Sequence, residues 1–422
     1  MKGEIKKEEL TWEIKRKLDK KNPSKDDVVN LLLDNRGLKT KKEKEEFLSP
    51  KTPKDIKLSD ASLTKKEIGK AIKRIKKAKD NKEAVIIYGD YDADGICATA
   101  ILWETLFSLG INALPYIPER FTEGYGLNED SLKTLKEENQ DLSLVITVDN
   151  GITAHSAAKA AKKMGIDLII TDHHQKEKKS PEVHSIIHTT AIGGAGISWL
   201  FSREISKEFE KGDLKKGLDL AAIGTISDLI PLLGPNRSIV KYGLEELNRT
   251  RRPGLNELFK EASIKKGTIG TYIVGYILAP RLNAMGRLEH AIDSLRLLCT
   301  TNGKRARSLA TKLGRTNRER QRVVEEVVLH ARESVGKKKW PGAIIISHES
   351  YHEGVIGLAA SRLVEEFYRP AIVISEGKKE SKASARSIPG FNIIEAIREF
   401  DEMLLSGGGH PMAAGFSIET KK

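Results

Sequence analysis

Hydrophobic and polar positions alternate in blocks along the middle of the chain, and the blocks predict strands and helices in turn. Apolar runs at 85–88, 144–148 and 168–170 have the length and the β-branched content of buried strands. The segment 154–164, between the second and third runs, carries a helical pattern. Strands that alternate with helices predict a parallel sheet with helices packed on it, so the fold class is α/β.

The two ends of the chain differ from this central block. Residues 1–80 are rich in Lys and Glu and predict helices without a strand, and apolar residues at helical spacing predict a long helix from about 304 to 335. Apolar runs at 343–347 and 371–375 predict the strands of a second, smaller α/β unit. We therefore expect four parts: a helical N-terminal segment (1–80), a main α/β domain (81–250), a helical connector with a long basic helix (251–336) and a small α/β domain (337–422).

Composition and charge narrow the class of protein. Of the 422 residues, 39% are hydrophobic and 31% charged, and no apolar run approaches the ~20 residues that cross a bilayer. The charged N-terminus lacks a secretory apolar stretch, and Cys97 and Cys299 form neither a disulfide framework nor a zinc pattern, so a cytoplasmic protein is expected. The net charge of +13 favours a polyanionic partner, although a lysine-rich solvated surface would give the same balance.

An acidic motif follows the first predicted strand. Residues 88–95 read Tyr-Gly-Asp-Tyr-Asp-Ala-Asp-Gly, with Asp90, Asp92 and Asp94 at alternate positions. Clustered carboxylates repel one another unless a cation neutralises them, and carboxylate oxygens suit hard divalent cations. A calcium-binding EF-hand loop would need Glu at its twelfth position, where this chain has Ile101. The motif therefore predicts a different type of metal site.

Three further motifs extend this constellation. Asp149 follows the second predicted strand, His173 and His174 follow the third, and Asp228 lies in an otherwise apolar segment. Sites in open α/β sheets form at the carboxyl ends of strands, so these side chains can converge. Mixed Asp and His ligands favour two Mn²⁺ or Mg²⁺ ions over structural zinc, and such a pair suits hydrolysis of a phosphodiester.

The four motifs, in this order and spacing, resemble those of the DHH phosphoesterase superfamily. Further segments resemble RecJ-like exonucleases within that superfamily. These segments are LLLDNRG (31–37), PERFTEGYGL (118–127), APRLNAMGRL (279–288), HEGVIG (352–357), RP (369–370), SARS (384–387) and GGGH (407–410). The resemblance covers nearly the whole chain and implies a DHH domain followed by a DHH-associated domain.

The resemblance also implies roles for individual residues. It assigns catalytic roles to Asp149, His173 and His174, with Asp149 bridging two ions and His174 contacting the scissile phosphate. The implied metal ligands are Asp90, Asp92, Asp94, Asp149, His173 and Asp228. The implied substrate-binding residues are Arg120, Tyr125, Arg281, Asn283, Arg287, Ser384, Arg386, Gly408, Gly409 and His410.

The activity implied is exonucleolytic, 5′ to 3′ degradation of single-stranded DNA in repair and recombination, with RNA left open as a substrate. Single-strand-binding protein or a helicase would be the family's partners, and no membrane is involved. A DHH phosphoesterase for nanoRNA or cyclic dinucleotides is the first alternative, and a non-catalytic replication scaffold is the second.

The chain departs from the family pattern in three places. Tyr88 stands where some relatives carry His, and residues 186–190 replace an expected Asn-Pro loop. The sequence ends soon after Phe416, where RecJ proteins continue into an OB-fold, so we expect a catalytic core without that domain.

Overall fold

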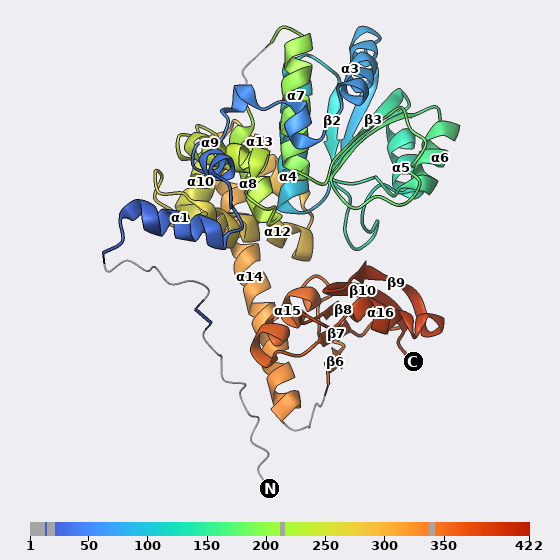
Figure 1. Ribbon diagram of the computed structural model, residues 1–422. Helices are drawn as coiled ribbons and strands as arrows, with labels where there is room; N and C mark the ends of the chain where they lie inside the picture. Colours follow the sequence, from blue (N-terminus) through green and yellow to red (C-terminus); the bar gives the residue numbers. More distant parts are fainter. Residues whose placement is uncertain (1–12, 15–21, 212–215, 337–341) are drawn as a thin grey trace.

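The computed structural model describes residues 13–14, 22–211, 216–336 and 342–422. A large α/β body is joined by one long helix to a small domain (Figure 1). The expected α/β class is confirmed, with a parallel sheet in the large body and a second sheet in the small domain. Parts of two expected segments, residues 1–12, 15–21 and 337–341, lie outside the described residues.

The main sheet has five parallel strands in the order β2-β1-β3-β4-β5. The bounds are β1 (Ala84–Tyr88), β2 (Ala113–Tyr116), β3 (Leu142–Val148), β4 (Asp167–Asp172) and β5 (Ser185–His188). Strand order reverses direction between β1 and β3, so the crossover connections diverge there and leave a crevice at the carboxyl ends of these two strands.

Helices cover both faces of the main sheet (Figure 1). On one face lie α3 (Lys65–Asp80), α4 (Ala93–Ser108) and α7 (Gly194–Glu208). On the other lie α5 (Glu129–Glu138) and α6 (His155–Lys163). Because helices cover both faces, β3 and β4 are buried at almost every position, as expected for strands of a parallel sheet.

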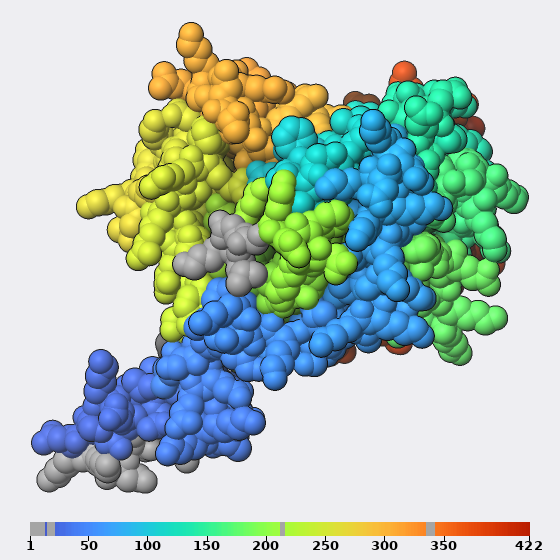
Figure 2. Space-filling view, turned by 90° about the horizontal axis from the view of Figure 1, so that it is seen from above, coloured from blue at the N-terminus to red at the C-terminus, as the bar shows by residue number. Residues whose placement is uncertain are grey.

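The N-terminal segment is helical where it is described, as the sequence predicts. Its elements are α1 (Lys25–Asn35), α2 (Lys41–Leu48) and the short 3-10 turns η1 (Pro53–Asp55) and η2 (Leu58–Ala61). In the space-filling view the dark-blue N-terminal residues form a protrusion at one corner of the molecule (Figure 2). The hydroxyl of Tyr242 donates to the carbonyl of Pro50 (3.2 Å), which ties this segment to the helical part of the body.

A helical part follows the main sheet and ends in the connecting helix. Its elements are α8 (Leu218–Ser227), α9 (Gly234–Asn248), α10 (Pro253–Glu261), α11 (Thr271–Ile273), a π-helical turn η3 (Val274–Leu278), α12 (Ala279–Leu288), α13 (Ile292–Cys299) and α14 (Gly303–Gly336). The first half of α14 packs in the main core through Ala310 and Leu313, and its second half packs in the small domain through Val324 and Val328. One helix therefore belongs to both cores.

The small domain is a mixed sheet in the order β6-β7-β8-β10-β9. Its elements are β6 (Ile344–His348), α15 (Ile356–Phe367), β7 (Ala371–Ser375), β8 (Glu380–Arg386), α16 (Ile393–Arg398), the 3-10 turn η4 (Asp401–Met403), β9 (Leu404–His410) and β10 (Ala413–Glu419). Only β6 and β7 pair in parallel, and the other pairs are antiparallel. The glycine run 407–409, which could also be read as a flexible turn, lies in the edge strand β9.

A partly buried carboxylate joins three helices of the connector. Glu261, the last residue of α10, accepts from Arg281 of α12 (2.8 Å) and from Arg318 of α14 (2.6 Å). Its carboxylate occupies the space beside Gly314 of α14, where a β-carbon would overlap it. The absent side chain at Gly314 therefore makes room for the ion pairs.

This packing predicts the opposite of the usual helix effect at Gly314. Gly→Ala in a helix interior normally gains about 1 kcal/mol, but Gly314→Ala should lower the free energy of unfolding by about 1–3 kcal/mol through overpacking. Urea denaturation measures this change. In a Glu261→Ala background the added methyl group has room, so the same substitution should become neutral or stabilising. Destabilisation in both backgrounds would contradict the role given to Glu261.

Candidate functional site

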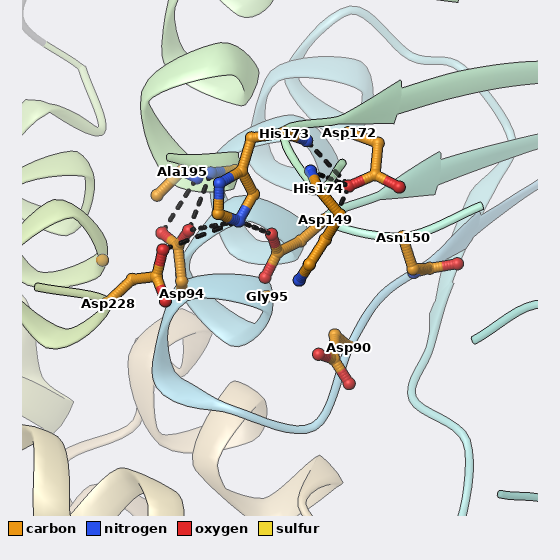
Figure 3. Close-up of polar contacts among 12 residues, drawn as sticks. Asp90, Asp94, Gly95, Asp149, Asn150, Asp172, His173, His174, Ala195 and Asp228 are labelled. Carbon is orange, nitrogen blue, oxygen red and sulfur yellow. Dashed lines mark hydrogen bonds and ion pairs between the residues drawn. The ribbon is translucent and has the colours of Figure 1, made fainter. Parts of the chain in front are cut away.

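Acidic side chains from four segments meet at the carboxyl edge of the main sheet, where the strand order reverses (Figure 3). Asp90 follows β1, Asp94 lies in the first turn of α4, and Asp149 follows β3 directly. His173 follows β4, and Asp228 arrives from the C-terminal end of α8. The sequence prediction that the motifs after the three strands converge is confirmed.

The ligand atoms fall into overlapping groups. Asp94, His173 and Asp228 offer atoms within 4.8 Å of one another, and so do Asp90, Asp92 and Asp149. Asp149 also groups with His173 and His174. The Nε2 atom of His173 lies 3.0 Å from Asp149 Oδ1, 3.6 Å from Asp228 Oδ2 and 4.0 Å from Asp94 Oδ2. Two adjacent cation sites that share Asp149 fit this arrangement.

Backbone amides at two helix N-termini hold the acidic loop in place. Asp92 caps α4 by accepting from the amides of Asp94 (2.9 Å) and Gly95 (3.0 Å). The carboxylate of Asp94 accepts from the amides of Gly194 (2.7 Å) and Ala195 (3.0 Å) at the start of α7. Helix N-termini carry partial positive charge, so both contacts offset the negative charge of the cluster.

The carboxylates of Asp149 and Asp94 pack directly against two glycines, and a larger residue at either glycine would have no room. A β-carbon at Gly194 would overlap Asp149, and one at Gly224 of α8 would overlap Asp94. Asp149 itself adopts a left-handed backbone conformation with φ 65°, which is uncommon outside glycine and is typical of strained functional positions. The surroundings therefore fix where the Asp149 carboxylate points.

Asp172 and His174 form a hydrogen-bonded pair beside the acidic cluster. Asp172 accepts from His174 Nδ1 (2.8 Å) and from the amides of His173 (2.7 Å) and Ile152 (2.9 Å). These contacts orient the His174 ring, and its Nε2 atom lies 3.3 Å from the hydroxyl of Tyr125. Burial alone would lower the pKa of His174, but the hydrogen bond and charge of Asp172 outweigh burial and raise this pKa to about 8.

In the metal-free protein, burial and mutual repulsion disfavour the ionised form of the clustered aspartates. Burial, reinforced by neighbouring carboxylates, raises the pKa of Asp90 and Asp149 well above the usual range. The same two causes raise the pKa of Asp94 to about 8 and that of Asp228 to about 6. Burial lowers the pKa of His173 to about 4, so this ring is neutral and able to coordinate a metal.

The donor set fits divalent cations. The Oδ1 atom of Asp149 is buried and has no hydrogen-bond partner among the described residues, although His173 lies close to it. A buried carboxylate oxygen without a partner is costly, and a cation would remove that cost. Asp90, Asp92, Asp94, Asp149, Asp228 and His173 supply the oxygen-rich set with one imidazole that Mn²⁺ and Mg²⁺ accept.

Two cavities adjoin the cluster. One of about 380 Å³ is lined by Asp90, Asp92, Tyr125, His174 and Asn283, together with Tyr91, Gly286, Arg120 and Arg287. The other, of about 500 Å³, lies between the large body and the small domain, and Tyr91, Arg120 and Arg287 line it as well. The small domain contributes Ser384, Arg386 and Gly408 to its wall. The shared residues join a metal-binding cavity to a basic one.

The basic cavity concentrates positive charge. The Arg120 guanidinium lies 5.0 Å from the centre of the Tyr91 ring. Burial, together with the charge of Arg120, lowers the pKa of Arg287 to about 10. Burial also lowers the pKa of Arg386. Crowded, partly desolvated guanidinium groups favour an anionic ligand such as phosphate.

Three of the expected substrate-binding residues are not brought to these cavities. Arg281 instead donates to Glu261 and to the carbonyl of Ile277 (2.9 Å), so the structure gives it a role in helix packing. Gly409 and His410 do not line either cavity. The side chain of Asn283, by contrast, lines the metal-binding cavity and accepts from the amide of Ala93 (2.7 Å), which supports the acidic loop.

Sequence reasoning gave no role to Asp172, Gly194 or Gly224, although the structure places all three around the cluster. A signal existed for Asp172, since a carboxylate beside two histidines suits an orienting partner. The glycine-rich run at 193–196 immediately before a helix was a signal for Gly194. The close approach at Gly224 depends on the crossing of α8 and α4, which the sequence pattern does not reveal.

Comparison with known proteins agrees with this geometry. Residues 84–225 match the model of the DHH family, N-terminal domain, and residues 341–422 match that of the DHHA1 domain. The chain is 32% identical to the single-stranded-DNA-specific exonuclease RecJ of Escherichia coli, over 84% of this chain and 67% of that protein. The chain belongs to the RecJ family. It is 40% identical to RecJ of Bacillus subtilis, with 98% of this chain and 53% of that protein covered.

Solved RecJ structures share the fold. RecJ of Thermus thermophilus in complex with Mn²⁺ superposes with a TM-score of 0.78 at 30% identity, covering 92% of this chain and 56% of that one. An exonuclease RecJ bound to manganese superposes with a TM-score of 0.76 at 32% identity, covering 86% and 92%. The chain thus spans about half the length of the B. subtilis relative and about two thirds of the E. coli one. Among the described residues, no helix is both long and apolar enough to cross a membrane.

Carboxylate repulsion in this RecJ-family protein predicts how Mn²⁺ and pH affect its stability. Carboxyls with raised pKa take up protons on folding, so their contribution to the stability of the metal-free protein falls as pH rises from about 4 to 8. Mn²⁺ displaces those protons, so its stabilising shift in Tm should grow between pH 6 and pH 8. Differential scanning calorimetry with and without Mn²⁺ measures both trends.

The matching variant is Asp149→Asn, which removes one charge and keeps the shape. At pH 8 it should be more stable than the wild type without metal, and it should lose most of the Mn²⁺-induced shift. An unchanged Mn²⁺ shift in this variant would show that Asp149 does not hold an ion.

A second prediction compares the effects of substitutions at two glycines of α7 on Mn²⁺ binding. Gly194→Ala places a methyl group in the space of the Asp149 carboxylate and should weaken Mn²⁺ binding by about tenfold or more, as other contacts around metal ligands do. Gly196→Ala, two residues along, meets ordinary contacts at 3.4 Å or more and should bind Mn²⁺ as the wild type does. Isothermal titration calorimetry on both variants checks this, with circular dichroism to confirm that each is folded. Equal Mn²⁺ affinities would contradict the steric role of Gly194.

Proposed function

We propose that the chain hydrolyses phosphodiester bonds of single-stranded DNA from an end, with two Mn²⁺ or Mg²⁺ ions. The observation that carries this proposal is the continuity between the Asp and His cluster and the basic cavity, through Tyr91, Arg120 and Arg287. The RecJ relatives are named single-stranded-DNA-specific exonucleases, and solved RecJ structures hold Mn²⁺ or Mg²⁺.

The proposed ligands are Asp90, Asp92, Asp94, Asp149, His173 and Asp228, with Asp149 shared. When bound, the ions would lower the pKa of an attacking water and offset the charge that develops on the phosphate. His174 is oriented by Asp172 and lies close to the Tyr125 hydroxyl, and in this proposal it would donate a hydrogen bond to a non-bridging phosphate oxygen. This donor would be preorganised, because its ring is fixed before substrate arrives.

The basic cavity accounts for action at an end. A phosphate held by Arg120, Arg287 and Arg386 would close the strand on that side, so the next phosphodiester would lie in the metal-binding cavity. Ser384 adds a hydroxyl donor, and it lies 3.1 Å from Arg386 Nη1. One nucleotide would be released at each step. The direction, 5′ to 3′, is taken from the resemblance to RecJ proteins.

The domain roles follow from the same proposal. Residues 81–250 would carry the chemistry, 251–336 would connect the two cavities, and 337–422 would hold the strand end. Single-strand-binding protein or a helicase as partner, and a role in repair and recombination, remain predictions that rest on the family. A cytoplasmic location remains a prediction that rests on the cysteine pattern and the charged N-terminus.

The test is a cleavage assay with the whole chain, Mn²⁺ and a single strand of ~40 nucleotides, several times a typical single-strand site. The strand is labelled at either end in parallel, and a blunt duplex is the substrate control. Stepwise loss from the 5′ end of the single strand is expected, and Asp149→Ala should lower the rate by roughly 100-fold or more. Arg386→Ala should raise KM for 5′-phosphorylated strands, whereas Arg398→Ala, exposed on α16, should not.

Two outcomes would change the proposal. Loss from the 3′ end would keep the chemistry and overturn the direction. Failure to cleave the strand, together with hydrolysis of dinucleotides, would assign the chain to the phosphoesterases that act on small substrates.

A further inference from the structure

A stacked pair of tyrosines is exposed on the helical part of the large body. Tyr272 and Tyr276 are 67% and 73% exposed, and their ring centroids lie 4.9 Å apart with the rings 26° from parallel. Tyr276 lies in the π-helical turn η3, a rare deviation that is frequent at functional sites. Two exposed rings side by side offer a flat π-surface to a ligand that approaches from solvent.

The pair lies on the same continuous helical segment as the site. The segment runs from α11 through η3 into α12, which carries Asn283 of the metal-binding cavity and Arg287, shared by both cavities. Asn283 and Arg287, four residues apart in α12, face the same side of that helix, and Tyr276 lies about two turns before Asn283 on the same segment. Along this segment the order is therefore tyrosine pair, metal-binding cavity, basic cavity.

The neighbouring helix α8 also connects the tyrosine pair to the acidic cluster. Gly275 packs against Ile226 of α8, where a β-carbon would lie 3.7 Å from the Ile226 side chain, and Asp228 follows two residues later. Leu229 comes next, 86% exposed and held at φ 55°. The left-handed conformation of Leu229 ends α8 as a C-terminal cap, in which the amide of Ile230 donates to the carbonyl of Thr225 (3.3 Å). This cap leaves the leucine side chain in solvent beside Asp228.

We propose that Tyr272 and Tyr276 form a platform on which unpaired bases of the incoming strand stack. This inference rests on the proposed function, because the strand end must lie in the basic cavity for the pair to meet the incoming side. Every base offers a π-face, so an aromatic platform holds a strand without reading its sequence. Paired bases in a duplex do not present these faces to it.

The helix sets the distance to the platform. Tyr276 and Tyr272 lie seven and eleven residues from Asn283, or about 10 and 16 Å at ~1.5 Å per residue. At a stacked spacing of ~3.4 Å per nucleotide, the platform meets about the third to fifth nucleotide beyond the scissile bond. Substrates of two nucleotides do not reach it.

The experiment uses the full chain in Ca²⁺, where binding is followed by fluorescence anisotropy, and then in Mn²⁺ for cleavage. The variants are Tyr272→Ala/Tyr276→Ala, the conservative Tyr272→Phe/Tyr276→Phe, and Phe107→Ala as matched control. Phe107 is an exposed ring stacked on Trp103 at the other end of α4, about 20 Å along that helix from the acidic loop.

The double Ala variant should raise Kd for a 12-nucleotide single strand by about tenfold or more, with Kd for a dinucleotide unchanged. The Phe variant and Phe107→Ala should bind both as the wild type does. A 2-aminopurine at the fourth position from the 5′ end should be quenched by the wild type and not by the double Ala variant.

Equal affinities of wild type and double Ala variant for the 12-nucleotide strand would overturn the platform while leaving cleavage in Mn²⁺ intact. A change in oligomeric state on Ala substitution with unchanged DNA binding would assign the pair to self-association and also overturn it. Absence of cleavage by the wild type in Mn²⁺ would instead count against the proposed function. The comparison of Kd values in Ca²⁺ would still show whether the tyrosine pair binds single-stranded DNA.

Discussion

Mutual repulsion of carboxylates at the carboxyl edge of the main sheet is the constraint on which the large body of the structure depends. Asp90, Asp94 and Asp149 are almost fully buried, and burial together with their neighbours raises the pKa of each. The positive ends of α4 and α7 offset this repulsion. Gly194 and Gly224 have no side chain, and the room that this leaves is filled by the carboxylates of Asp149 and Asp94. The remaining negative charge is neutralised by protons in the metal-free protein, and divalent cations that displace these protons would neutralise it in their place.

The same constraint explains why the surroundings are rigid. A metal site must hold its ligands to a fraction of an ångström, and loops alone do not achieve this. Here each ligand is anchored by a strand end or a helix end, and the acidic loop is fixed from below by Asn283 of α12. Since α12 also carries Arg287, which donates to the carbonyl of Gly354 in the small domain (3.3 Å), one helix connects the metal cluster to the wall of the basic cavity.

The fold and the metal cluster were predictable from the sequence to different depths. The strands β1, β3, β4, β6 and β7 follow from apolar runs, and the ligands follow because short acidic motifs come directly after three of those runs. The edge strands β2, β5 and β9 were not predicted, because four residues such as 113–116 with an internal proline, or a run of glycines, carry no strand signal. Arg281 shows a different limit, because a motif match cannot tell whether a guanidinium binds phosphate or a neighbouring carboxylate such as that of Glu261.

The helical segment formed by η3 and α12 links the tyrosine pair, the metal cluster and the basic cavity. Their order in space could not be predicted from the sequence. Its π-turn, its cavity-lining Asn283 and its buried Arg287 occur in the order in which a single strand would pass the tyrosine pair, the metal cluster and the basic cavity. Helical segments advance by roughly 1.5 Å per residue, so under the proposal this segment would set a distance along the substrate as well as support the site. Under the proposed function, selectivity for an unpaired end would need no reading of base edges. It would follow from a phosphate held in the basic cavity on one side of the metal cluster and exposed aromatic faces on the other.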